Sequence, residues 1–539
     1  MREIRSPLDG ILSPFAAKPT PLSGAATLAA GEAEAFALDF TDSSIFVKDT
    51  GTPANNIDQT GLFNAAGEAI GPQSRLTYTN PTPKQVLQAD GLLKFGAHNL
   101  YVNSEAPADQ SVTLVNGASY VMTITGGVSV TVSGAATGTY TAGDNTFTAA
   151  SGTLTCGSTS GSGTVHLRRT PSVSSYVKTT SAPVYALPID HDTSGNQIGV
   201  LVEPQATNLS VNQPTTGNLV SAGVTATAGQ TDPSGTTTAL KLEFDGGDDD
   251  YCYFQNIGST AAGTYTGSVY IKADSATDIG IRIASASAGT PQTVDVVSVT
   301  TQWKKFHVTF TSTVSDQILF GLDTRSSITG DDGAAKTVYV AFVQVEAGAT
   351  PTSYIATYGA TVTRSADNIT EATSAMPYDA TAGMLYAYGA GRRTAAVGVV
   401  TSINVFAAFE ESSTSSNVLM VSRSGFGITT LENEAVGYIK SGNADQMLAE
   451  NVGTLANDTF GRMAIAASAN NGGFAFDGTA AATDTSVTMP TGINQLTLVN
   501  WQGQSAYGVN PTYIKQVMYL PRRVSNTDLQ TLTSTGALP

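Results

Sequence analysis

A repeated segment limits what this chain can fold into more than any other feature does. Residues 99–103 (NLYVN) return 109 positions later as residues 208–212 (NLSVN), and residues 165–184 return 178 positions later as residues 343–362. The second copy therefore carries 69 more residues between its matching ends. Matching ends around a different middle indicate one domain design used twice. The matched positions share no catalytic residue types, so the repeat favours building and binding over chemistry.

The composition indicates short β-strands joined by small-residue turns. At 539 residues the chain is too long for one core, and roughly two to four domains are expected. Only 13% of the residues are charged, about half the usual share, and Thr, Ser, Ala and 54 Gly fill the deficit. Disordered chains are rich in charge and poor in Val, Ile and aromatic residues, so disorder does not fit.

Net charge and cysteine usage exclude several classes of protein. A formal net charge of −17 disfavours nucleic acid as a partner, because phosphate binding needs a Lys/Arg surface. Cys156 and Cys252 lie in different repeats outside any Cys-x-x-Cys pattern, so we expect buried free thiols and no disulfide framework. No segment approaches about 18 consecutive apolar residues, so no membrane insertion is expected. The N-terminus lacks the apolar core of a signal peptide, which predicts a product made and kept in the cytoplasm.

Residues 1–30 are predicted to form an extended arm rather than a domain. Two Ser-Pro steps flank an Asp-Gly turn within residues 6–14, and proline biases the preceding residue away from helix. The arm holds too many apolar residues for a free tail, so they need a surface to lie on, either this protein's own body or a neighbour's. These residues are Ile4, Leu8, Ile11, Leu12 and Phe15.

Three β-rich regions come next. Residues 31–98 show a weak strand pattern. Residues 99–198 form the first repeat, where alternating apolar residues are separated by Asn116-Gly117 and Gly126-Gly127, a strong hairpin signal. Residues 199–370 form the second repeat and alternate in the same way. Because antiparallel strands buried on one face can stack into two sheets, both repeats are predicted to be β-sandwiches of jelly-roll type.

The last region, residues 371–539, alternates again and then changes period. After a predicted strand at 513–520, Ser525 can cap a helix and Asp528 completes a capping-box variant. Leu529 and Leu532 then face the core at helical spacing. The sequence thus predicts an all-β fold of tandem antiparallel β-sandwiches with a short C-terminal helix.

Several stretches resemble one family of proteins. Residues 199–209 (GVLVEPQATNL), 232–239 (DPSGTTTA), 344–348 (QVEAG) and 363–367 (TRSAD) resemble a carbohydrate-binding-module-like domain common in tailed-phage fibre and virion proteins. Residues 517–532 are similar to the last strand and helix of concanavalin-like (laminin-G-like) domains, and residues 4–10 (IRSPLDG) resemble the start of structural proteins from phages of alphaproteobacteria. The first repeat departs from the family, because it is short and lacks the middle strands.

The resemblance implies a phage virion structural protein, a tail or head fibre or appendage, made in the bacterial host cytoplasm. Residues 1–30 would dock on other virion proteins, the repeats would act as spacers, and residues 371–539 would bind host-surface glycan non-covalently as a lectin-like domain. The implied oligomer is a homotrimer. The alternative is a purely structural decoration or bracing protein of the head or tail that binds no receptor. A polysaccharide depolymerase is a minor third alternative.

One acidic cluster suggests a metal. Asp245, Asp248, Asp249 and Asp250 place four carboxylates within six residues, and calcium takes six to eight oxygen ligands. The spacing is not that of an EF-hand loop, and Gly-Asp runs are ordinary turn chemistry. A solvated loop is the competing interpretation, and no other cofactor is expected.

Sugar binding would need exposed aromatic rings beside amide or carboxylate groups. Tyr251 and Tyr253 flank the acidic cluster, and a Gly-, Ser- and Asn-rich loop in the last region offers a denser set. The competing interpretation is that these rings belong to the core, where most Tyr and Trp of sandwiches pack. The predicted glycan contacts in the loop are Trp501, Asn500, Gln502, Tyr507 and Asn510.

No pattern of catalytic residues stands out. A glycosidase needs two carboxylates facing one sugar bond, and Glu432-Asn433-Glu434 offers only one pair on a strand face. Neither a Gly-x-Ser-x-Gly elbow nor a phosphate loop occurs. The four histidines have no zinc-ligand spacing: they are His98, His166, His191 and His307. The sequence therefore predicts a protein that is not an enzyme.

Overall fold

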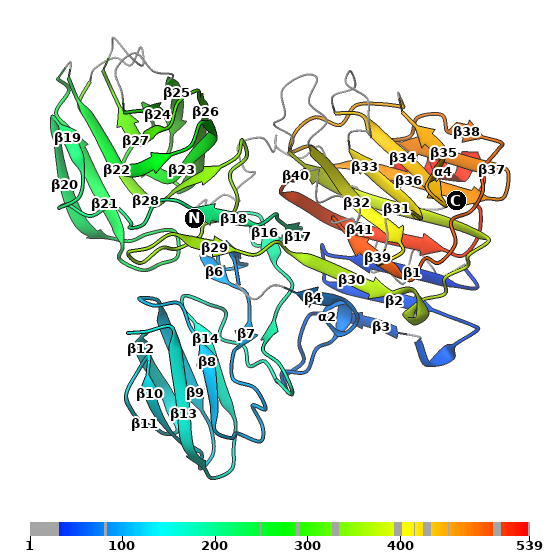
Figure 1. The fold of residues 1–539 in the computed structure, drawn as a ribbon, viewed down its shortest axis with the longest axis horizontal. Coiled ribbons are helices and arrows are strands. Elements are labelled where there is room, and N and C mark those ends of the chain that lie inside the picture. Colours follow the sequence, from blue (N-terminus) through cyan, green and yellow to red (C-terminus); the bar gives the residue numbers. More distant parts are fainter. Residues whose placement is uncertain are drawn as a thin grey trace.

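Three sandwiches surround a central junction in the computed structural model (Figure 1). It describes residues 32–55, 57–79, 83–247, 249–286, 292–325, 334–392, 402–413, 416–423, 433–450, 452–499 and 508–536. Strands make up nearly all of the regular structure in this part of the chain. The predicted all-β fold of tandem sandwiches with a short C-terminal helix is confirmed. Within the described ranges, no helix has the length and apolar character needed to cross a membrane.

The first repeat folds into a small sandwich. Its strands are β8 (Gln110–Thr113), β9 (Ser119–Ile124), β10 (Ser129–Gly134), β11 (Gly138–Tyr140), β12 (Gly143–Thr148), β13 (Thr153–Ser160) and β14 (Val165–Arg169). One sheet has the order β11-β10-β13-β8 and the other has the order β12-β9-β14. Alternating apolar residues, among them Met122, Val130 and Leu154, fill the space between the two sheets. The period-two pattern of the sequence thus faces the core as expected.

The second repeat folds into a larger sandwich. Its strands are β19 (Val220–Ala222), β20 (Val224–Gln230), β21 (Ala239–Phe244), β22 (Tyr251–Thr260), β23 (Gly263–Ala273), β24 (Thr277–Ser285), β25 (Gln292–Val299), β26 (Lys304–Ser312), β27 (Asp316–Asp323) and β28 (Lys336–Ala347). We name β19-β22-β27-β24-β25 the outer sheet and β20-β21-β28-β23-β26 the inner sheet. The inner sheet faces the rest of the molecule, because Tyr270 and Phe342 belong to a buried cluster that contains Leu87 and Leu93.

A repeated asparagine explains why the ends of the two repeats match. In the first copy, the Asn99 side-chain amide donates to the Val177 carbonyl (2.9 Å), and its side-chain oxygen accepts from the Leu167 N–H (3.0 Å). The side chain thereby ties the entry of the repeat to its last strand and to the segment that leaves it. Asn99 itself is fully buried.

The second copy makes the same bonds at the positions that align. Asn208 donates to the Ile355 carbonyl (2.8 Å) and accepts from the Val345 N–H (3.2 Å). Asn208 is also fully buried, and a buried amide must satisfy both its oxygen and its nitrogen. The repeated residues therefore mark hydrogen bonds that close each domain at its two ends. These bonds do not depend on how many strands lie between the ends.

The third sandwich uses strands from both ends of the chain and from its middle. They are β1 (Ala35–Asp39), β2 (Ser44–Lys48), β3 (Ile57–Thr60), β4 (Thr77–Thr79), β16 (Ile189–His191), β17 (Gln197–Val202), β30 (Asn368–Ala372), β31 (Ala382–Gly391), β32 (Ser402–Glu410), β33 (Val418–Arg423), β34 (Ala435–Ser441), β35 (Ala444–Ala449), β36 (Gly461–Ser468), β37 (Asn471–Phe476), β38 (Ala482–Asp484), β39 (Gln495–Leu498), β40 (Gly508–Val509) and β41 (Thr512–Leu520). A ten-stranded sheet contains β3-β2-β1-β41-β31-β36-β37-β38, with β17 also beside β41 and β16 beside β17. The eight-stranded sheet contains β35-β34-β33-β32-β39-β30-β4, with β40 parallel to β32. Residues 31–98 thus contribute β1 to β4 to the same sandwich as residues 371–539.

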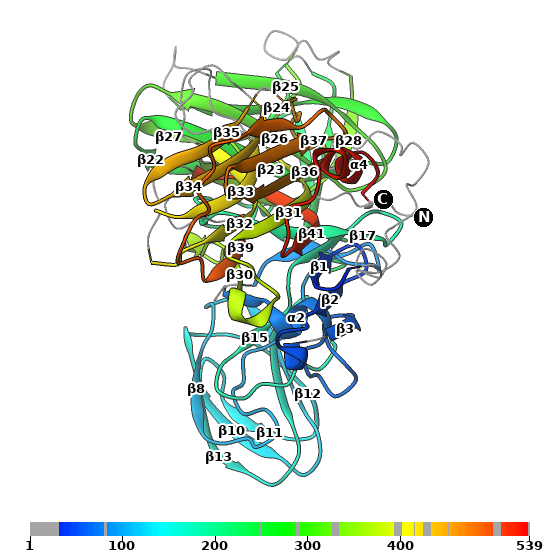
Figure 2. The same cartoon turned by 90° about the vertical axis from the view of Figure 1, so that its right-hand side faces the viewer.

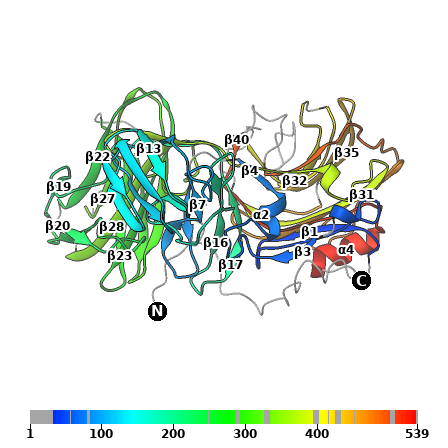
Figure 3. The ribbon, with the colours of Figure 1, turned by 90° about the horizontal axis from the view of Figure 1, so that it is seen from below.

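The C-terminal helix α4 (Asn526–Thr535) covers the ten-stranded sheet. Ser525 and Asp528 exchange two hydrogen bonds of 3.1 Å, so the predicted capping box is present. Leu529 and Leu532 are fully buried against this sheet. Figure 3 shows α4 on the side of β31 and β1 that is turned away from β32 and β35. The helix therefore closes the second face of the sheet.

Short elements fill the junction between the sandwiches. They are η1 (Pro53–Asn55), α2 (Gly71–Arg75), β5 (Gln85–Leu87), β6 (Leu93–Phe95), β7 (His98–Asn99), β15 (Val184–Tyr185), β18 (Ala206–Asn208), β29 (Val362–Arg364) and η2 (Thr373–Ala375). β5 pairs with β6, β7 with β15, and β18 with β29. Figure 2 shows the first sandwich extending from this junction, below the other two.

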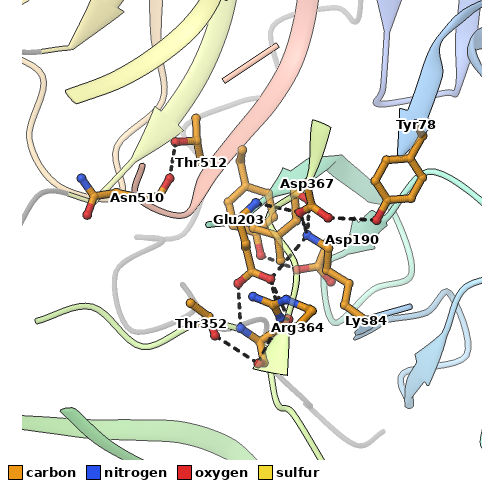
Figure 4. A network of polar contacts seen from close by, with 12 residues as sticks. Tyr78, Lys84, Asp190, Glu203, Thr352, Arg364, Asp367, Asn510 and Thr512 are labelled. Atoms are coloured by element: carbon orange, nitrogen blue, oxygen red, sulfur yellow. Dashed lines mark hydrogen bonds and ion pairs between the residues drawn. The ribbon is translucent and has the colours of Figure 1, made fainter. Parts of the chain in front are cut away.

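Four buried charged residues meet at the junction (Figure 4). The Lys84 ammonium contacts Asp367 and lies 3.4 Å from the Glu203 carboxylate. The Arg364 guanidinium lies 3.0 Å from the same Glu203 carboxylate. None of the four side chains is more than 1% exposed. Two positive and two negative charges thus balance inside the protein, and we name these residues the charge quartet.

Neutral donors complete the quartet. The Ser353 N–H and hydroxyl each donate to Glu203 at 2.6 Å. Tyr78 donates to Asp367 at 3.0 Å, and the Glu203 N–H donates to Asp367 at 2.8 Å. The partners come from the N-terminal segment, from the linker before the second sandwich and from the segment that leaves it. Glu203, Arg364 and Asp367 all lie in stretches that carry the family resemblance, so those stretches mark a joint between domains.

The quartet sets the protonation of Glu203. Burial by itself would raise the pKa of this carboxyl, but the Arg364 guanidinium, the Lys84 ammonium and the Ser353 donors outweigh burial and lower the pKa from 4.5 to about 2. Glu203 is therefore ionised in the folded protein at neutral pH, and breaking the quartet leaves charges buried without a partner.

We predict that Glu203→Gln destabilises the chain by about 3–5 kcal/mol, because Arg364 and Lys84 lose their shared carboxylate. The free energy of unfolding from denaturant titration measures the loss. The matched control is Glu243→Gln: Glu243 pairs with Lys241 at 2.7 Å but is 43% exposed. That variant should stay within about 1 kcal/mol of the wild type. Equal losses in the two variants would contradict the role of the quartet.

A second prediction concerns acid. Glu203 is unprotonated in the folded chain down to a pH near 2, whereas in the unfolded chain it takes up a proton near pH 4.5. Its contribution to stability is therefore complete above about pH 4.5 and is lost as the pH falls toward 2. The stability gap between wild type and Glu203→Gln should narrow over this window. If the difference in the free energy of unfolding between the two proteins stays constant from about pH 6 to about pH 2.5, the pKa of Glu203 is not lowered in the folded chain.

Candidate functional site

The acidic loop uses its carboxylates to hold its own backbone. Asp250 accepts from the N–H groups of Gly246 (2.9 Å) and Gly247 (3.1 Å), and Asp245 accepts from Gly247 at 2.9 Å. Asp250 is also packed over Gly223, where any side chain would meet it: a Cβ would lie 1.7 Å from the Asp250 carboxylate. Asp249 lies in the same loop, and Asp248 is outside the described residues.

No metal centre is formed by the part of the chain that is described. In those residues no three His, Cys, Asp or Glu side chains gather where they could hold an ion. Two of the four predicted calcium ligands, Asp245 and Asp250, are instead acceptors for backbone N–H groups. Calcium at this loop stays a prediction, because Asp248 is not described.

The predicted sugar loop of the last region lies almost wholly outside the described residues. This holds for Asn500, Trp501, Gln502 and Tyr507. The remaining member, Asn510, is buried, and its carbonyl accepts from the Thr512 hydroxyl at 2.9 Å (Figure 4). The apolar arm residues also lie outside the described ranges: they are Ile4, Leu8, Ile11, Leu12 and Phe15.

Three of the four histidines are buried, His307 is half-buried, and each side chain is bonded within the protein. Burial lowers the pKa of His98 and of His166 to about 4, although each ring also bonds to a backbone carbonyl at 2.8 Å. His191 bonds to the Leu87 carbonyl at 2.9 Å, and His307 accepts from Arg392 at 2.8 Å. Each side chain is therefore engaged in packing the molecule. Of the glutamate pair, Glu432 is outside the described residues.

Tyr251 and Tyr253 lie on the face of the outer sheet that is turned away from the sandwich core. Their neighbours on β22, Cys252 and Phe254, point into the core, so the tyrosines face the other way. Strand pairing places Tyr251 beside Asp323. A second row crosses the five strands through residues that face outward: Val220, Tyr253, Gly321, Arg282 and Val294.

Two arginines cover these tyrosines. The Arg325 guanidinium lies 4.8 Å from the centre of the Tyr251 ring, and the Arg282 guanidinium lies 5.7 Å from that of Tyr253. Both arginines also pair with the fully buried Asp323 carboxylate, at 3.2 Å for Arg282 and 2.6 Å for Arg325. Tyr253 is only 7% exposed. We name this cluster the tyrosine–arginine face; it presents guanidinium groups rather than bare rings.

A polar pocket of about 310 Å³ opens at one end of the inner sheet. We name it the lysine–tyrosine pocket. It lies beside the buried cluster around Leu87 and Leu93, against which Tyr339 packs. Its lining residues are Gln230, Thr231, Lys272, Ala273, Asp274, Thr301 and Tyr339. Six of these seven side chains carry a polar group.

Strand register builds this pocket. Tyr339 on β28 pairs with Lys241 on one side and with Lys272 on the other, so the three side chains stand in one row across the sheet. The Lys272 ammonium lies 4.9 Å from the Tyr339 ring centre and 5.2 Å from that of the buried Trp303. Asp274 follows β23 and is exposed at the rim. The pocket thus joins a half-buried aromatic ring to one cation and one carboxylate.

The protonation of the pocket fits a recognition site. Burial raises the pKa of Tyr339, and a hydrogen bond to Asp274 raises it further. Tyr339 therefore keeps its phenolic proton at neutral pH. The arrangement can stack on an apolar surface and exchange hydrogen bonds with hydroxyl groups.

Sequence reasoning missed the pocket because its members come from four separate segments. Gln230 and Tyr339 lie more than a hundred positions apart. One signal was present: in the strand Val338-Tyr339-Val340, the polar-tipped residue alternates with two core residues and so must face outward. The partners on the neighbouring strands follow only from the register.

Comparison with known proteins gives fold likeness only. No protein-family model and no curated protein matches the chain. Among solved structures, the CBM40 of the Ruminococcus gnavus IT-sialidase bound to α2,3-sialyllactose aligns with a TM-score of 0.23 and 11% identity, over 29% of this chain and 84% of that one. A mutant NanB sialidase from Streptococcus pneumoniae gives 0.24 and 10%, over 30% and 26%. The tandem CBM22 domains of Paenibacillus barcinonensis Xyn10C give 0.21 and 10%, over 60% and 97%.

Two of these three similarities cover only about 30% of this chain. This chain covers only about a quarter of the NanB sialidase. At such identities and TM-scores, the matches establish nothing about what this chain binds. The class that the fold defines is an all-β protein of three linked sandwiches.

Proposed function

We propose that this chain binds glycans reversibly and that the lysine–tyrosine pocket holds the sugar. The observation that carries the proposal is the gathering of six polar side chains, one of them an aromatic, in a concave site of about 310 Å³. Ligand sites are concave, usually a few hundred Å³ or more, and fix their ligand by a few placed polar groups. The space suits one or two sugar rings.

Each lining group has a role that sugar chemistry explains. The face of the Tyr339 ring that Lys272 does not cover would receive the apolar C–H side of a sugar ring, while Asp274 accepts from two neighbouring hydroxyls. The Gln230 amide and the hydroxyls of Thr231 and Thr301 both donate and accept. Lys272 donates only, and its stacking on Tyr339 holds it in place.

The same inventory favours binding over hydrolysis. Cleavage of a glycosidic bond uses two carboxyl groups on opposite sides of that bond. Asp274 is the single carboxylate among the residues that line the pocket. We therefore propose a non-catalytic role, with a depolymerase as the lesser alternative.

The wider role proposed is that of a virion appendage. The support is the sequence resemblance to tailed-phage fibre proteins, together with three sandwiches linked at a fixed junction. In a homotrimer, several weak sugar contacts would add up to firm attachment through effective concentration. A bracing protein of the head or tail that binds no receptor is the second candidate, favoured by the covered rings of the tyrosine–arginine face.

We predict that Tyr339→Ala and Asp274→Ala each weaken glycan binding by about tenfold or more, because each removes over 1 kcal/mol of contact. A glycan array probed with the full chain identifies the sugar, and calorimetry measures the affinity. The full chain is needed because the third sandwich takes strands from residues 35–79. The matched control is Tyr251→Ala on the tyrosine–arginine face, which should leave the affinity unchanged.

The alternative outcomes separate the candidates. A loss with Trp501→Ala, but not with Tyr339→Ala, would move the sugar site to the loop predicted from sequence and reject the pocket. Wild-type protein that binds no glycan of the authentic host envelope would favour the bracing role.

The virion role makes its own prediction. Deleting residues 1–30 should leave a folded, soluble chain, since β1 begins at Ala35, but the chain should no longer join the particle. Thermal unfolding checks the fold, and immunogold labelling of assembled particles checks incorporation. Truncated protein found on particles at the wild-type level would show that the arm does not attach the chain.

A further inference from the structure

A groove of about 550 Å³ lies where the first sandwich meets the ten-stranded sheet. One wall is the loop after β3, and the other is the connector that follows β14; β5 and β16 form the floor. Figure 2 shows β3, α2 and β15 at this junction. The apolar side chains that line the groove are Leu62, Phe63, Val86, Val173, Tyr176 and Ile189. We name it the junction groove.

The walls of the groove combine apolar side chains with fixed polar groups. Leu62, Phe63 and Val173 are only half-buried, so each still shows apolar surface to the groove. His191 is held by its bond to the Leu87 carbonyl (2.9 Å), and the Gln197 side chain accepts from Ser43 at 2.7 Å. An extended peptide needs such a lining, since its side chains bury apolar area while its backbone requires hydrogen-bond partners.

We propose that the junction groove binds the N-terminal arm of this chain, residues 4–15. The arm supplies apolar side chains that can pack on this apolar lining: Ile4, Leu8, Ile11, Leu12 and Phe15. Its two Ser-Pro steps favour an extended course and remove two backbone N–H groups that would otherwise need acceptors. The inference is independent of the proposed glycan binding.

The arm can reach the groove from where the described chain begins. Glu32 is fixed by Arg522 (3.0 Å) and by the Lys48 side chain, which donates to its carbonyl at 2.6 Å. Lys48 ends β2, and Ser43, just before β2, lines the groove. One five-residue strand, about 17 Å, therefore separates the anchor from the groove. The segment from Phe15 to Glu32 can span about 55 Å when extended, so it reaches the groove with slack.

Groove and particle would then compete for the same segment. An arm seated in the junction groove cannot at the same time lie on another virion protein. Docking on a particle, as proposed above, would require the arm to leave the groove, and the groove would keep the arm's apolar residues out of water until then.

Cysteine cross-linking tests this inference on the full chain. Both native thiols, Cys156 and Cys252, are buried, so introduced cysteines are the reactive ones. The test variant carries Ser13→Cys in the arm and Ala65→Cys, an exposed residue at the groove. The matched control carries Ser13→Cys with Val296→Cys, which is 48% exposed on the outer sheet of the second sandwich. A short bismaleimide links the pairs, and peptide mass spectrometry scores the products.

We expect the groove pair to cross-link faster than the control pair by about tenfold or more, because a seated arm raises the effective concentration of the two thiols. Products within one chain would place the arm in its own groove, and products between chains would place it in the groove of a neighbouring copy; both support the assignment. Equal rates for the two pairs overturn it and leave the groove to another partner. Thermal unfolding of each variant confirms that the comparison uses folded protein.

Discussion

The placement of the second sandwich at the junction depends on the charge quartet. Lys84, Glu203, Arg364 and Asp367 come from three separate segments, and their side chains are almost completely buried. Burying such ions costs several kcal/mol each, which pairing only offsets. If one domain shifted by a few ångströms, a buried charge would lose its partner. The quartet therefore fixes the relative position of the segments more than it adds to net stability. The quartet therefore also fixes the positions of residues in any ligand site near the junction.

The junction also decides which surfaces remain open. Tyr270 and Phe342 of the inner sheet are buried in the cluster around Leu87 and Leu93, and the lysine–tyrosine pocket lies beside that cluster, where Tyr339 is half-buried. On the outward face of the outer sheet, guanidinium groups lie over the tyrosines. The two faces of one sandwich therefore offer different chemistry. One is a concave polar site and the other a flat, already stacked surface.

Local features of the fold could be predicted from the sequence, and distant pairings could not. Alternation predicted the strands of the first repeat, and Ser525 with Asp528 predicted the capping box, because both signals involve residues close in sequence. The hairpins predicted at Asn116-Gly117 and Gly126-Gly127 are wrong, because these turns join β9 to β8 and to β10, which lie in the opposite sheet. The repeated Asn99 and Asn208 were visible as a pattern, although their bonds were not. The pairing of β1 with β41 joins residues more than 470 positions apart, which no period reveals. The lysine–tyrosine pocket could not be predicted for the same reason, because pairing between distant strands brings its residues together. The predicted sugar loop around Trp501 lies outside the described residues.

The central position of β41 has a consequence for biosynthesis. This strand is paired with β31 along one edge and with β1 and β17 along the other, and all nine of its residues are buried. A ribosome makes it after all three of these partners. Until it emerges, β1, β17 and β31 each have an unpaired edge that can recruit strands from other nascent chains. Assembly of the third sandwich must therefore wait until β41 has been made, and slow translation of the segment between β31 and β41 would favour aggregation over folding.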